Sequence, residues 1–261
     1  MRHEEYKTIY RRDASRRRHF ARREHGGIGK RVLAILAVVI LVMATAFFGY
    51  TAKYYHNDEI ANAILKDENS FIIDNGGYLK LPGNAEGDLY DPFEAVIFYP
   101  GGKVEYTSYL PLLKQLQDRG ITCFLIKMPF NLAFFDMDAA EKVINENSQY
   151  TTWDLIGHSL GGVAASSYFA DNEETFDKVV LLGSYIYGDV ESRDKVLLIY
   201  GTEDINLDLS QIRQTDNKVV IEGGNHCQFG NYGFQKGDGE ASISREEQQN
   251  IAANSIMEWI M

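Results

Sequence analysis

One stretch, residues 152–162, constrains the fold of this 261-residue chain more than any other. The short apolar run TWDLI (152–156) leads into Gly-His-Ser-Leu-Gly-Gly (157–162), and a run typical of a helix follows at once. Glycines on both sides of a serine allow a tight strand-to-helix turn that exposes the hydroxyl, which is the pattern of a nucleophile elbow. An ordinary helix-opening turn is the alternative. In either case, a buried strand followed directly by a helix favours an α/β fold.

The chain after residue 70 repeats this alternation of strand and helix. Residues 71–81 are expected to form two short strands around the turn signal Asp-Asn-Gly-Gly. Six mostly apolar runs follow, at 95–99, 121–126, 152–156, 179–182, 196–200 and 219–221. Near-continuous apolarity is typical of strands covered on both faces. The sequence therefore predicts a mostly parallel, doubly wound sheet with helices on both faces.

Helices are expected in the gaps, with short polar side chains as their N-caps. Such side chains accept hydrogen bonds from the first N–H groups of a helix. The expected capping residues are Asn57, Ser108, Asp138 and Ser244. The helix after the elbow should cover residues 160–170. The apolar stripe of the last helix, expected at 244–261, consists of Ala252, Ile256, Trp259 and Ile260.

Residues 32–49 read VLAILAVVILVMATAFFG, in which Thr45 is the only polar side chain. A helix of 18 to 20 residues reaches about 27–30 Å, close to the thickness of a bilayer's hydrocarbon core. Basic residues precede the run and tyrosines follow it, so we expect a transmembrane helix at 32–50 with a cytoplasmic N-terminus. The alternative is a cleaved signal peptide, because Ala-Thr-Ala at 44–46 fits a cleavage site. Both interpretations place the body outside the cytoplasm.

Charge is distributed unevenly along the chain. Residues 1–31 hold 11 Lys and Arg against 4 Asp and Glu, whereas the remaining 230 residues hold 15 against 33. An acidic body repels a phosphate backbone, so no nucleic-acid partner is expected. The predicted organisation is a basic cytoplasmic leader at 1–31, the membrane helix at 32–50, a juxtamembrane linker at 51–69 and the α/β domain at 70–261.

Ser159, the serine of the elbow, needs a base to take its proton before it can act as a nucleophile. Three histidines lie beyond the membrane run. His56 is beside that run, and His158 is expected to point away from its neighbour Ser159. His226 follows the last strand in a Gly-rich loop, which can return over the C-terminal edge of the sheet, so His226 is the expected base.

A carboxylate is expected to hold the base in the correct tautomer. Asp204 lies on the loop after the penultimate strand, Val-Leu-Leu-Ile-Tyr, and is the first candidate. Glu203 and Asp208 are nearby alternatives, and solvated loop acids are common at such positions. The expected order along the chain is therefore Ser159, Asp204, His226.

An oxyanion formed at this serine requires two preorganised N–H donors. The backbone of Leu160, directly after the nucleophile, is one candidate. The loop Pro-Gly-Gly-Lys at 100–103 follows a strand and allows close approach of a backbone, which makes Gly102 the second candidate and Lys103 its alternative. A plain Gly-rich turn is the competing interpretation of this loop.

Five blocks of this sequence together resemble the α/β-hydrolase fold-5 family. They are residues 98–104, 127–133, 157–162, 200–204 and 223–230. The resemblance covers about residues 70–261 and implies a serine hydrolase of dienelactone-hydrolase-like architecture, with Ser159, Asp204 and His226 as its triad. Cys227 stands where the family has a small residue such as Ala, a departure that leaves the triad intact. Segment 228–239 also resembles a family block, without an assigned role.

The sequence leaves little room for a cap over the site. Only residues 183–195 separate two strands between which many α/β-hydrolases insert a cap domain, so no large cap is expected. Phe130, Phe134 and Tyr185 follow strands at the same edge and either pack internally or line a substrate cleft. If they line the cleft, an ester with an apolar acyl or alkyl group fits it.

The expected function is that of a membrane-anchored, extracytoplasmic carboxylic-ester hydrolase that acts through an acyl-serine on a small-molecule or lipid-like ester. No metal or cofactor is required by this chemistry. A thioesterase, lipase, peptidase or acyltransferase acting on envelope molecules would use the same residues. A non-catalytic, membrane-tethered binding module is the alternative from a different class. The sequence does not determine the oligomeric state.

Overall fold

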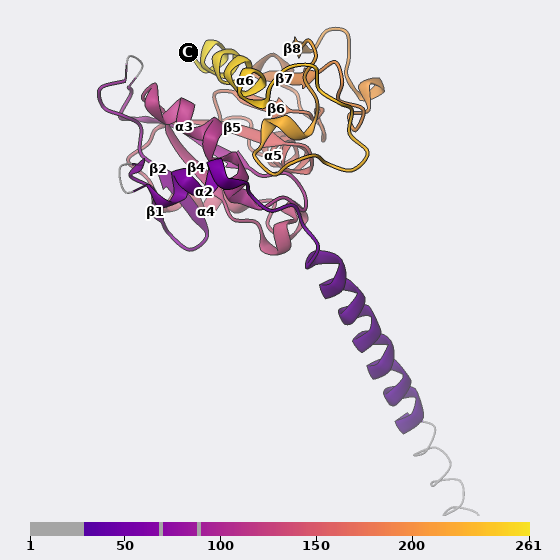
Figure 1. Cartoon of the computed structure of the whole chain (residues 1–261). Coiled ribbons are helices and arrows are strands. Elements are labelled where there is room, and N and C mark those ends of the chain that lie inside the picture. The colour runs from indigo at the N-terminus through magenta and orange to yellow at the C-terminus, as the bar shows by residue number, and fades with distance from the viewer. Residues whose placement is uncertain (1–28, 68–69, 88–89) are drawn as a thin grey trace, which may run out of the picture. The chain divides into compact units, whose positions relative to one another are not determined.

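The computed structural model describes residues 29–67, 70–87 and 90–261. The chain divides into two compact units, Met1–Ala52 and Lys53–Met261. Most of the basic leader, up to residue 28, lies outside the described residues. Residues Gly29–Thr51 form one helix, drawn in indigo in Figure 1, that is long and apolar enough to cross a bilayer. A signal sequence can have the same length and composition, so these two properties alone do not distinguish it from a membrane span.

The second unit is built on one eight-stranded sheet with the strand order β1-β2-β4-β3-β5-β6-β7-β8. β1 pairs antiparallel with β2, and β2 antiparallel with β4, whereas all other neighbours are parallel. The sheet is therefore mostly parallel, as the sequence predicts. The strands are β1 (Ile73–Asp74), β2 (Tyr78–Leu81), β3 (Glu94–Tyr99), β4 (Thr122–Ile126), β5 (Thr152–His158), β6 (Val179–Leu182), β7 (Val196–Gly201) and β8 (Asn217–Ile221).

Every strand expected from an apolar run is present; four agree with the prediction to within one residue at each end, and two differ by two residues. β5 continues two residues beyond Ile156, because Gly157 still pairs with Tyr99 of β3 and His158 with Leu182 of β6. β8 begins at Asn217, two residues early, because it lies at the sheet edge, where exposed and partly buried residues alternate. Polar residues fit an edge strand, and an apolar run therefore marks only part of it.

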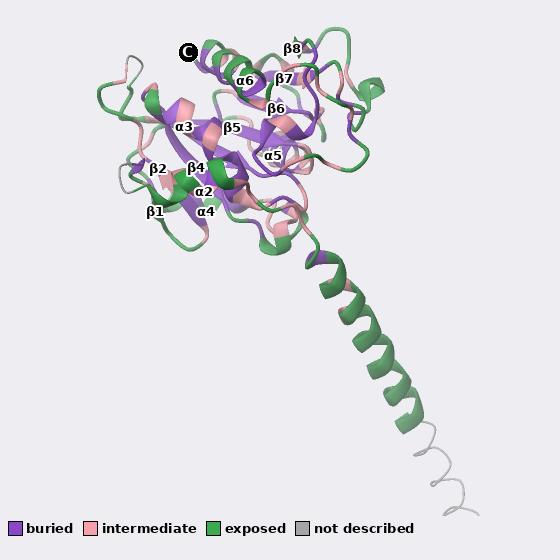
Figure 2. Cartoon of the chain, in the orientation of Figure 1, coloured by how far each residue is buried: buried purple, intermediate pink, exposed green. Residues whose placement is uncertain are grey.

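Five helices are described in this unit: α2 (Glu59–Lys66), α3 (Leu110–Asp118), α4 (Ala139–Glu146), α5 (Leu160–Ala170) and α6 (Arg245–Ile260). They form two apolar layers on opposite faces of the sheet. One layer contains buried residues of α3 and α6 with Val96 and Phe98 of β3. The other contains buried residues of α4 and α5 with the alternate β3 residues Ile97 and Tyr99. Figure 2 shows the buried strands and the buried inner sides of these helices.

Two of the four expected N-caps differ from the prediction. The cap of α2 is Asp58, which accepts hydrogen bonds from the N–H groups of residues 60 and 61, whereas Asn57 instead bonds to Asn62 and Thr107. Ser108 lies inside the 3₁₀ turn η2 (Tyr106–Tyr109) that precedes α3, because the chain already turns before the helix begins.

The other two expected capping positions are confirmed. Asp138 occupies the N-cap of α4 but forms no capping hydrogen bond with its side chain. Ser244 caps α6 by accepting a hydrogen bond from Glu247 N. The stripe of α6 faces the core, with Ala252, Ile256 and Ile260 buried and Trp259 packed against them.

The connection between β6 and β7 and the segment before α2 both differ from a simple linker or cap. Between β6 and β7 the chain forms only a loop with the short 3₁₀ turn η5 (Arg193–Lys195), so no cap domain is inserted there, as expected. Residues 53–67, part of the expected linker 51–69, belong to the second compact unit, where Glu59–Lys66 form α2. Asp58, at the start of α2, is held by Asn231 and Arg245 from the opposite end of the chain.

Candidate active site

Ser159 occupies a strained turn at the carboxyl end of β5. Its backbone has φ 52° and ψ −121°, an unusual conformation for a residue with a side chain, and it precedes the first residue of α5. A Cβ atom at Gly157 would come within 2.6 Å of the carbonyl oxygen of Gly161, so only glycine fits there. Ser159 N donates to Leu182 O of β6 at 2.9 Å, and Ser184 Oγ donates to Ser159 O at 3.0 Å. These contacts hold the elbow from both sides.

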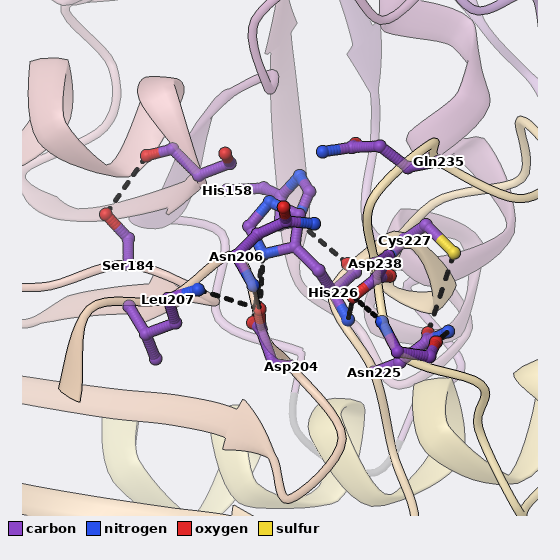
Figure 3. Close-up of polar contacts among 12 residues, drawn as sticks. His158, Ser184, Asp204, Asn206, Leu207, Asn225, His226, Cys227, Gln235 and Asp238 are labelled. Atoms are coloured by element: carbon purple, nitrogen blue, oxygen red, sulfur yellow. Dashed lines mark hydrogen bonds and ion pairs between the residues drawn. The ribbon is translucent and has the colours of Figure 1, made fainter.

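His226 and Asp204 form a buried hydrogen-bonded pair. His226 Nδ1 donates to the Asp204 carboxylate, at 3.0 Å from Oδ1 and 2.9 Å from Oδ2. Both side chains are almost fully buried. Asp204 Oδ1 also accepts from the backbone N–H groups of Asn206 and Leu207, so three donors fix the carboxylate (Figure 3). With Nδ1 as the donor, a neutral His226 has its lone pair on Nε2, where a base needs it.

The two alternative carboxylates make other contacts. Glu203 Oε1 accepts a hydrogen bond from Thr202 Oγ1 at an exposed position. Asp208 is exposed and caps the 3₁₀ turn η6 (Leu209–Gln211), and the hydrogen bonds to Ser210 and Gln211 lower its pKa. Within the part of the chain that the structure describes, neither forms a hydrogen bond or an ion pair with His226. Asp204 is the acid that the fold brings to the base.

The pair lies beside the elbow. Gly183, directly after β6, has φ 50°, and a Cβ atom there would come within 2.9 Å of both Asp204 Oδ2 and His226 Nδ1. The preceding residue of β6, Leu182, accepts the hydrogen bond from Ser159 N. Ser159 Oγ and the His226 ring share no hydrogen bond among the described residues. Such bonds are often long in structures without substrate and shorten in the reacting complex.

His158 connects the serine loop to the loop of the base, a role that the sequence does not indicate. Its Nε2 donates to His226 O at 3.1 Å, and its ring centroid lies 4.7 Å from that of His226. Burial and the neighbouring His226 lower the pKa of His158 well below its usual value, so the ring is neutral. Because His226 O only accepts, the proton of His158 is on Nε2, and Nδ1 is an acceptor.

Tyr109, in η2, completes this connection. Its hydroxyl lies 2.8 Å from His158 Nδ1 and accepts a hydrogen bond from Gly101 N at 3.0 Å. Burial raises the pKa of Tyr109, so the phenol keeps its proton and donates it to the free Nδ1 of His158. The resulting chain of hydrogen bonds runs from Gly101, in the expected oxyanion loop, through Tyr109 and His158 to the backbone of His226. All four residues are buried.

The family-like segment 228–239, which had no assigned role, supports the same loop. Asp238 is buried, and its carboxylate accepts from His226 N at 3.3 Å and from Cys227 N at 2.8 Å (Figure 3). Asn225 N donates to Gln248 of α6, which anchors the loop to the last helix. The only sequence signal for this support is the aspartate within Gly-Asp-Gly at 237–239, 12 residues after the histidine.

The candidate oxyanion donors lie side by side. Leu160 N–H is the first of α5 and therefore has no acceptor within the helix. A Cβ atom on Gly102 would lie 3.1 Å from Leu160 Cβ, which places the two residues in direct contact. Lys103 N already donates to Asn131 O at 2.7 Å, so its N–H is occupied, which favours Gly102 over its alternative.

The three candidate pocket residues differ in exposure. Phe130 and Phe134 are 44% and 61% exposed, and Tyr185 is half-buried. The two phenylalanines therefore do not pack in the core. No group of three or more His, Cys, Asp or Glu side chains among the described residues is arranged to hold a metal ion.

The chain is similar to known proteins both in sequence and in fold. The model of the alpha/beta hydrolase family matches residues 95–250, more than half of the chain. Three similar solved structures show the same fold. XC6422 from Xanthomonas campestris, described as an α/β serine hydrolase without a lid, is 15% identical, with 70% of this chain and 88% of that chain covered and a TM-score of 0.50.

Est1E from Butyrivibrio proteoclasticus is 15% identical, covering 72% of this chain and 97% of its own, with a TM-score of 0.50. MGS-MChE2, an alpha/beta hydrolase enzyme from a metagenome of sediments of the lagoon of Mar Chica, Morocco, is 12% identical, covering 72% and 96%, with a TM-score of 0.51. No curated protein matches the chain. The family match over the whole elbow-to-base region establishes that this chain belongs to the alpha/beta hydrolase family and is an enzyme of its serine-hydrolase type.

Proposed function

We propose that this protein is a membrane-anchored, extracytoplasmic carboxylic-ester hydrolase in which Ser159, His226 and Asp204 are the catalytic triad. The observation that carries the proposal is the buried His226–Asp204 pair, which leaves Nε2 of the base free at the edge of the sheet where the elbow ends. The Lewis-basic nitrogen of His226, the serine and two N–H donors that have no partner among the described residues are the groups that acyl transfer requires.

The reaction has two steps of the same kind. Ser159 Oγ attacks the ester carbonyl as His226 Nε2 takes its proton, and the oxyanion is stabilised by the N–H groups of Leu160 and Gly102. The bond between the acyl carbon and the alcohol oxygen then breaks, and the imidazolium gives its proton to the alcohol. Water, activated by His226, releases the carboxylic acid and restores Ser159. Asp204 stabilises the imidazolium in both steps.

The anchor is the helix Gly29–Thr51, whose length and composition suit a bilayer. Basic residues on its N-terminal side and Tyr50 and Tyr54 on the other favour an N-terminus in the cytoplasm and the hydrolase outside. Mass spectrometry of the protein from membranes tests this directly, since a cleaved signal peptide would remove the residues up to about 46. Protease digestion of intact cells tests the side on which the hydrolase lies.

Hydrolysis of p-nitrophenyl butyrate by the unit Lys53–Met261 tests the chemistry. This unit retains Tyr55, which pairs with Val104, and Asp58, which a later start would remove or expose. We expect turnover that Ser159→Ala abolishes, and labelling of Ser159 by a fluorophosphonate. Ser210→Ala, at an exposed position within η6, is the matched control and should retain both. Activity that survives Ser159→Ala would refute the assignment.

Other acyl substrates and a non-catalytic role give different outcomes. A thioesterase, peptidase, lipase or acyltransferase would be labelled by the fluorophosphonate, so a panel of thioester, amide and long-chain ester substrates separates them from a simple esterase. A binding module would show no labelling at Ser159. The intact elbow and the three donors that hold Asp204 favour catalysis.

A further inference from the structure

An exposed group of aromatic side chains lies on the segment after β4. Phe130, Phe134 and Phe135 are 44%, 61% and 50% exposed, and the rings of Phe130 and Phe135 pack edge to face at 5.4 Å. They belong to two consecutive 3₁₀ turns, η3 (Pro129–Asn131) and η4 (Ala133–Phe135). Contiguous exposed apolar surface on a folded protein marks a place of interaction. We call these three residues the aromatic patch.

The aromatic patch adjoins the candidate oxyanion loop. Lys103 N donates to Asn131 O, between Phe130 and Phe134 in sequence, and Lys103 follows Gly102. The turn η4 also lies against α5, the helix that begins at the elbow. The aromatic patch therefore borders the part of the molecule where a substrate's carbonyl would be held.

The segment that follows the apolar helix is fastened to the same loop. Tyr55 N donates to Lys103 O, and Glu105 N donates to Tyr55 O, both at 2.8 Å, so the two segments form a short parallel bridge. The apolar helix ends at Thr51, and Tyr55 is the fourth residue after it. Since a residue spans at most about 3.6 Å, Tyr55 stays within roughly 14 Å of the end of the helix in any orientation, and the loop bridged to it lies about 5 Å from Tyr55.

These observations combine if the helix spans a membrane. A tether of about 14 Å starts where a spanning helix leaves the bilayer and is short compared with the bilayer's thickness of ~40–45 Å, so the loop is held close to the bilayer surface. Apolar aromatic rings at that depth are stabilised by about 25 cal/mol for each Å² of apolar surface that leaves water. The acidic body has no attraction for anionic lipid, so apolar contact, not charge, is the favourable term.

We propose that the aromatic patch lies in the membrane interface and that the enzyme hydrolyses an acyl ester resident in that bilayer, which reaches Ser159 across the patch. This inference rests on the proposed function and names its substrate class. The bond between acyl carbon and ester oxygen breaks as Ser159 Oγ bonds to the acyl carbon. The lipid alcohol leaves with the proton from His226, and water then releases the fatty acid.

The depth of the aromatic patch in the membrane can be measured by tryptophan fluorescence, independently of enzyme activity. The full chain is reconstituted in phosphatidylcholine vesicles as Phe134→Trp or as the control Phe93→Trp. Phe93 is similarly exposed, at 57%, but precedes β3 and so lies at the opposite edge of the parallel sheet, about 20 Å away along the strand. The native Trp153 and Trp259 contribute equally to both variants.

We expect brominated phosphatidylcholine to quench at least half of the added fluorescence in Phe134→Trp and almost none in Phe93→Trp. Equal quenching in the two variants would overturn the placement of the aromatic patch in the membrane.

Substrate class is measured as a ratio of two activities in the same vesicles. One substrate is a fluorogenic long-chain acyl ester embedded in the bilayer, and the other is water-soluble p-nitrophenyl acetate. We expect the ratio of bilayer to soluble turnover to fall at least tenfold in Phe134→Ser and to stay within twofold of wild type in Phe93→Ser. An equal change in both variants would overturn the route across the patch.

The two proposals fail in different ways. Wild-type protein that hydrolyses the soluble ester but not the bilayer ester refutes the substrate class and leaves the hydrolase assignment intact. Protein that hydrolyses neither ester, and is not labelled by a fluorophosphonate at Ser159, refutes both. Hydrolysis of the bilayer ester that Ser159→Ala abolishes supports both.

Discussion

Removal of one hydroxyl, in Tyr109→Phe, is the sharpest test of the hydrogen-bond chain beneath the site. The hydroxyl accepts from Gly101 N and donates to His158 Nδ1, and the whole side chain is buried. Phenylalanine fills the same space but leaves both partners without a bond. A buried group left unpaired costs about 1–3 kcal/mol.

Two unpaired groups would cost about 2–6 kcal/mol in the free energy of unfolding. We expect a loss of about 3 kcal/mol, in the lower part of this range, because the variant no longer has a phenol hydroxyl to desolvate on folding. For a unit of about 200 residues, each kcal/mol lowers the melting temperature by about 2–4 °C, so the expected shift is roughly 6–12 °C. Activity on a soluble ester should fall about tenfold, since Gly101 precedes the oxyanion residue and His158 holds the base loop.

Thermal unfolding followed by circular dichroism, on the unit Lys53–Met261, measures the stability, and initial rates on p-nitrophenyl butyrate measure the activity. Tyr232→Phe is the matched control. Its ring is also buried, but its hydroxyl bonds only to the half-exposed Gln235 side chain at 3.3 Å, which can turn to water. The control should lose less than about 1 kcal/mol. A shift in Tyr109→Phe no larger than that of Tyr232→Phe would refute the argument.

Three further outcomes follow from the structure. Gly183→Ala should lower the rate constant kcat at least tenfold, because its Cβ atom would displace the Asp204–His226 pair. Gly76→Ala is the matched control, since Gly76 also has a positive φ but an added Cβ atom would meet nothing within 4 Å, and an unchanged kcat in Gly183→Ala would contradict the geometry. Asp238→Asn should lower kcat more than it changes KM, since an amide has only one oxygen to accept from His226 N and Cys227 N, and steady-state kinetics will show whether the two constants separate. Stability of the wild type should decrease between about pH 4 and pH 8, by at most about 1.4 kcal/mol per pH unit, and denaturant titrations should show a smaller decrease in Asp154→Asn.

The sign of the pH effect follows from the environment of Asp154. Burial, with the neighbouring Glu94, raises the pKa of this carboxyl to about 8, so the folded protein keeps the proton there. The unfolded chain releases that proton near pH 4, and the folded state therefore binds more protons between these values. The contribution of Asp154 to the free energy of unfolding is fully present below the pKa of the unfolded chain and is lost as the pH rises through the pKa of the folded state.

Much of the fold is visible in the sequence because local rules dominate there. The runs at 95–99 and 179–182 are apolar throughout since both faces of a central parallel strand are covered, and each is a strand in the structure. The start of β8 and the cap of α2 were less predictable. The first depends on which strand is the sheet edge, and the second on a contact between Asp58 and the distant Asn231.

The sequence by itself determined the elbow, because a strand, a serine between glycines and a helix are neighbours along the chain. It also identified Asp204 and His226 as candidates through their places after successive strands, whose carboxyl ends share one edge of the sheet. Only the tertiary structure decided what holds them: Tyr109, His158 and Asp238 act through contacts 11 to 68 residues away in sequence. Such contacts depend on how the layers pack, and no local pattern encodes them.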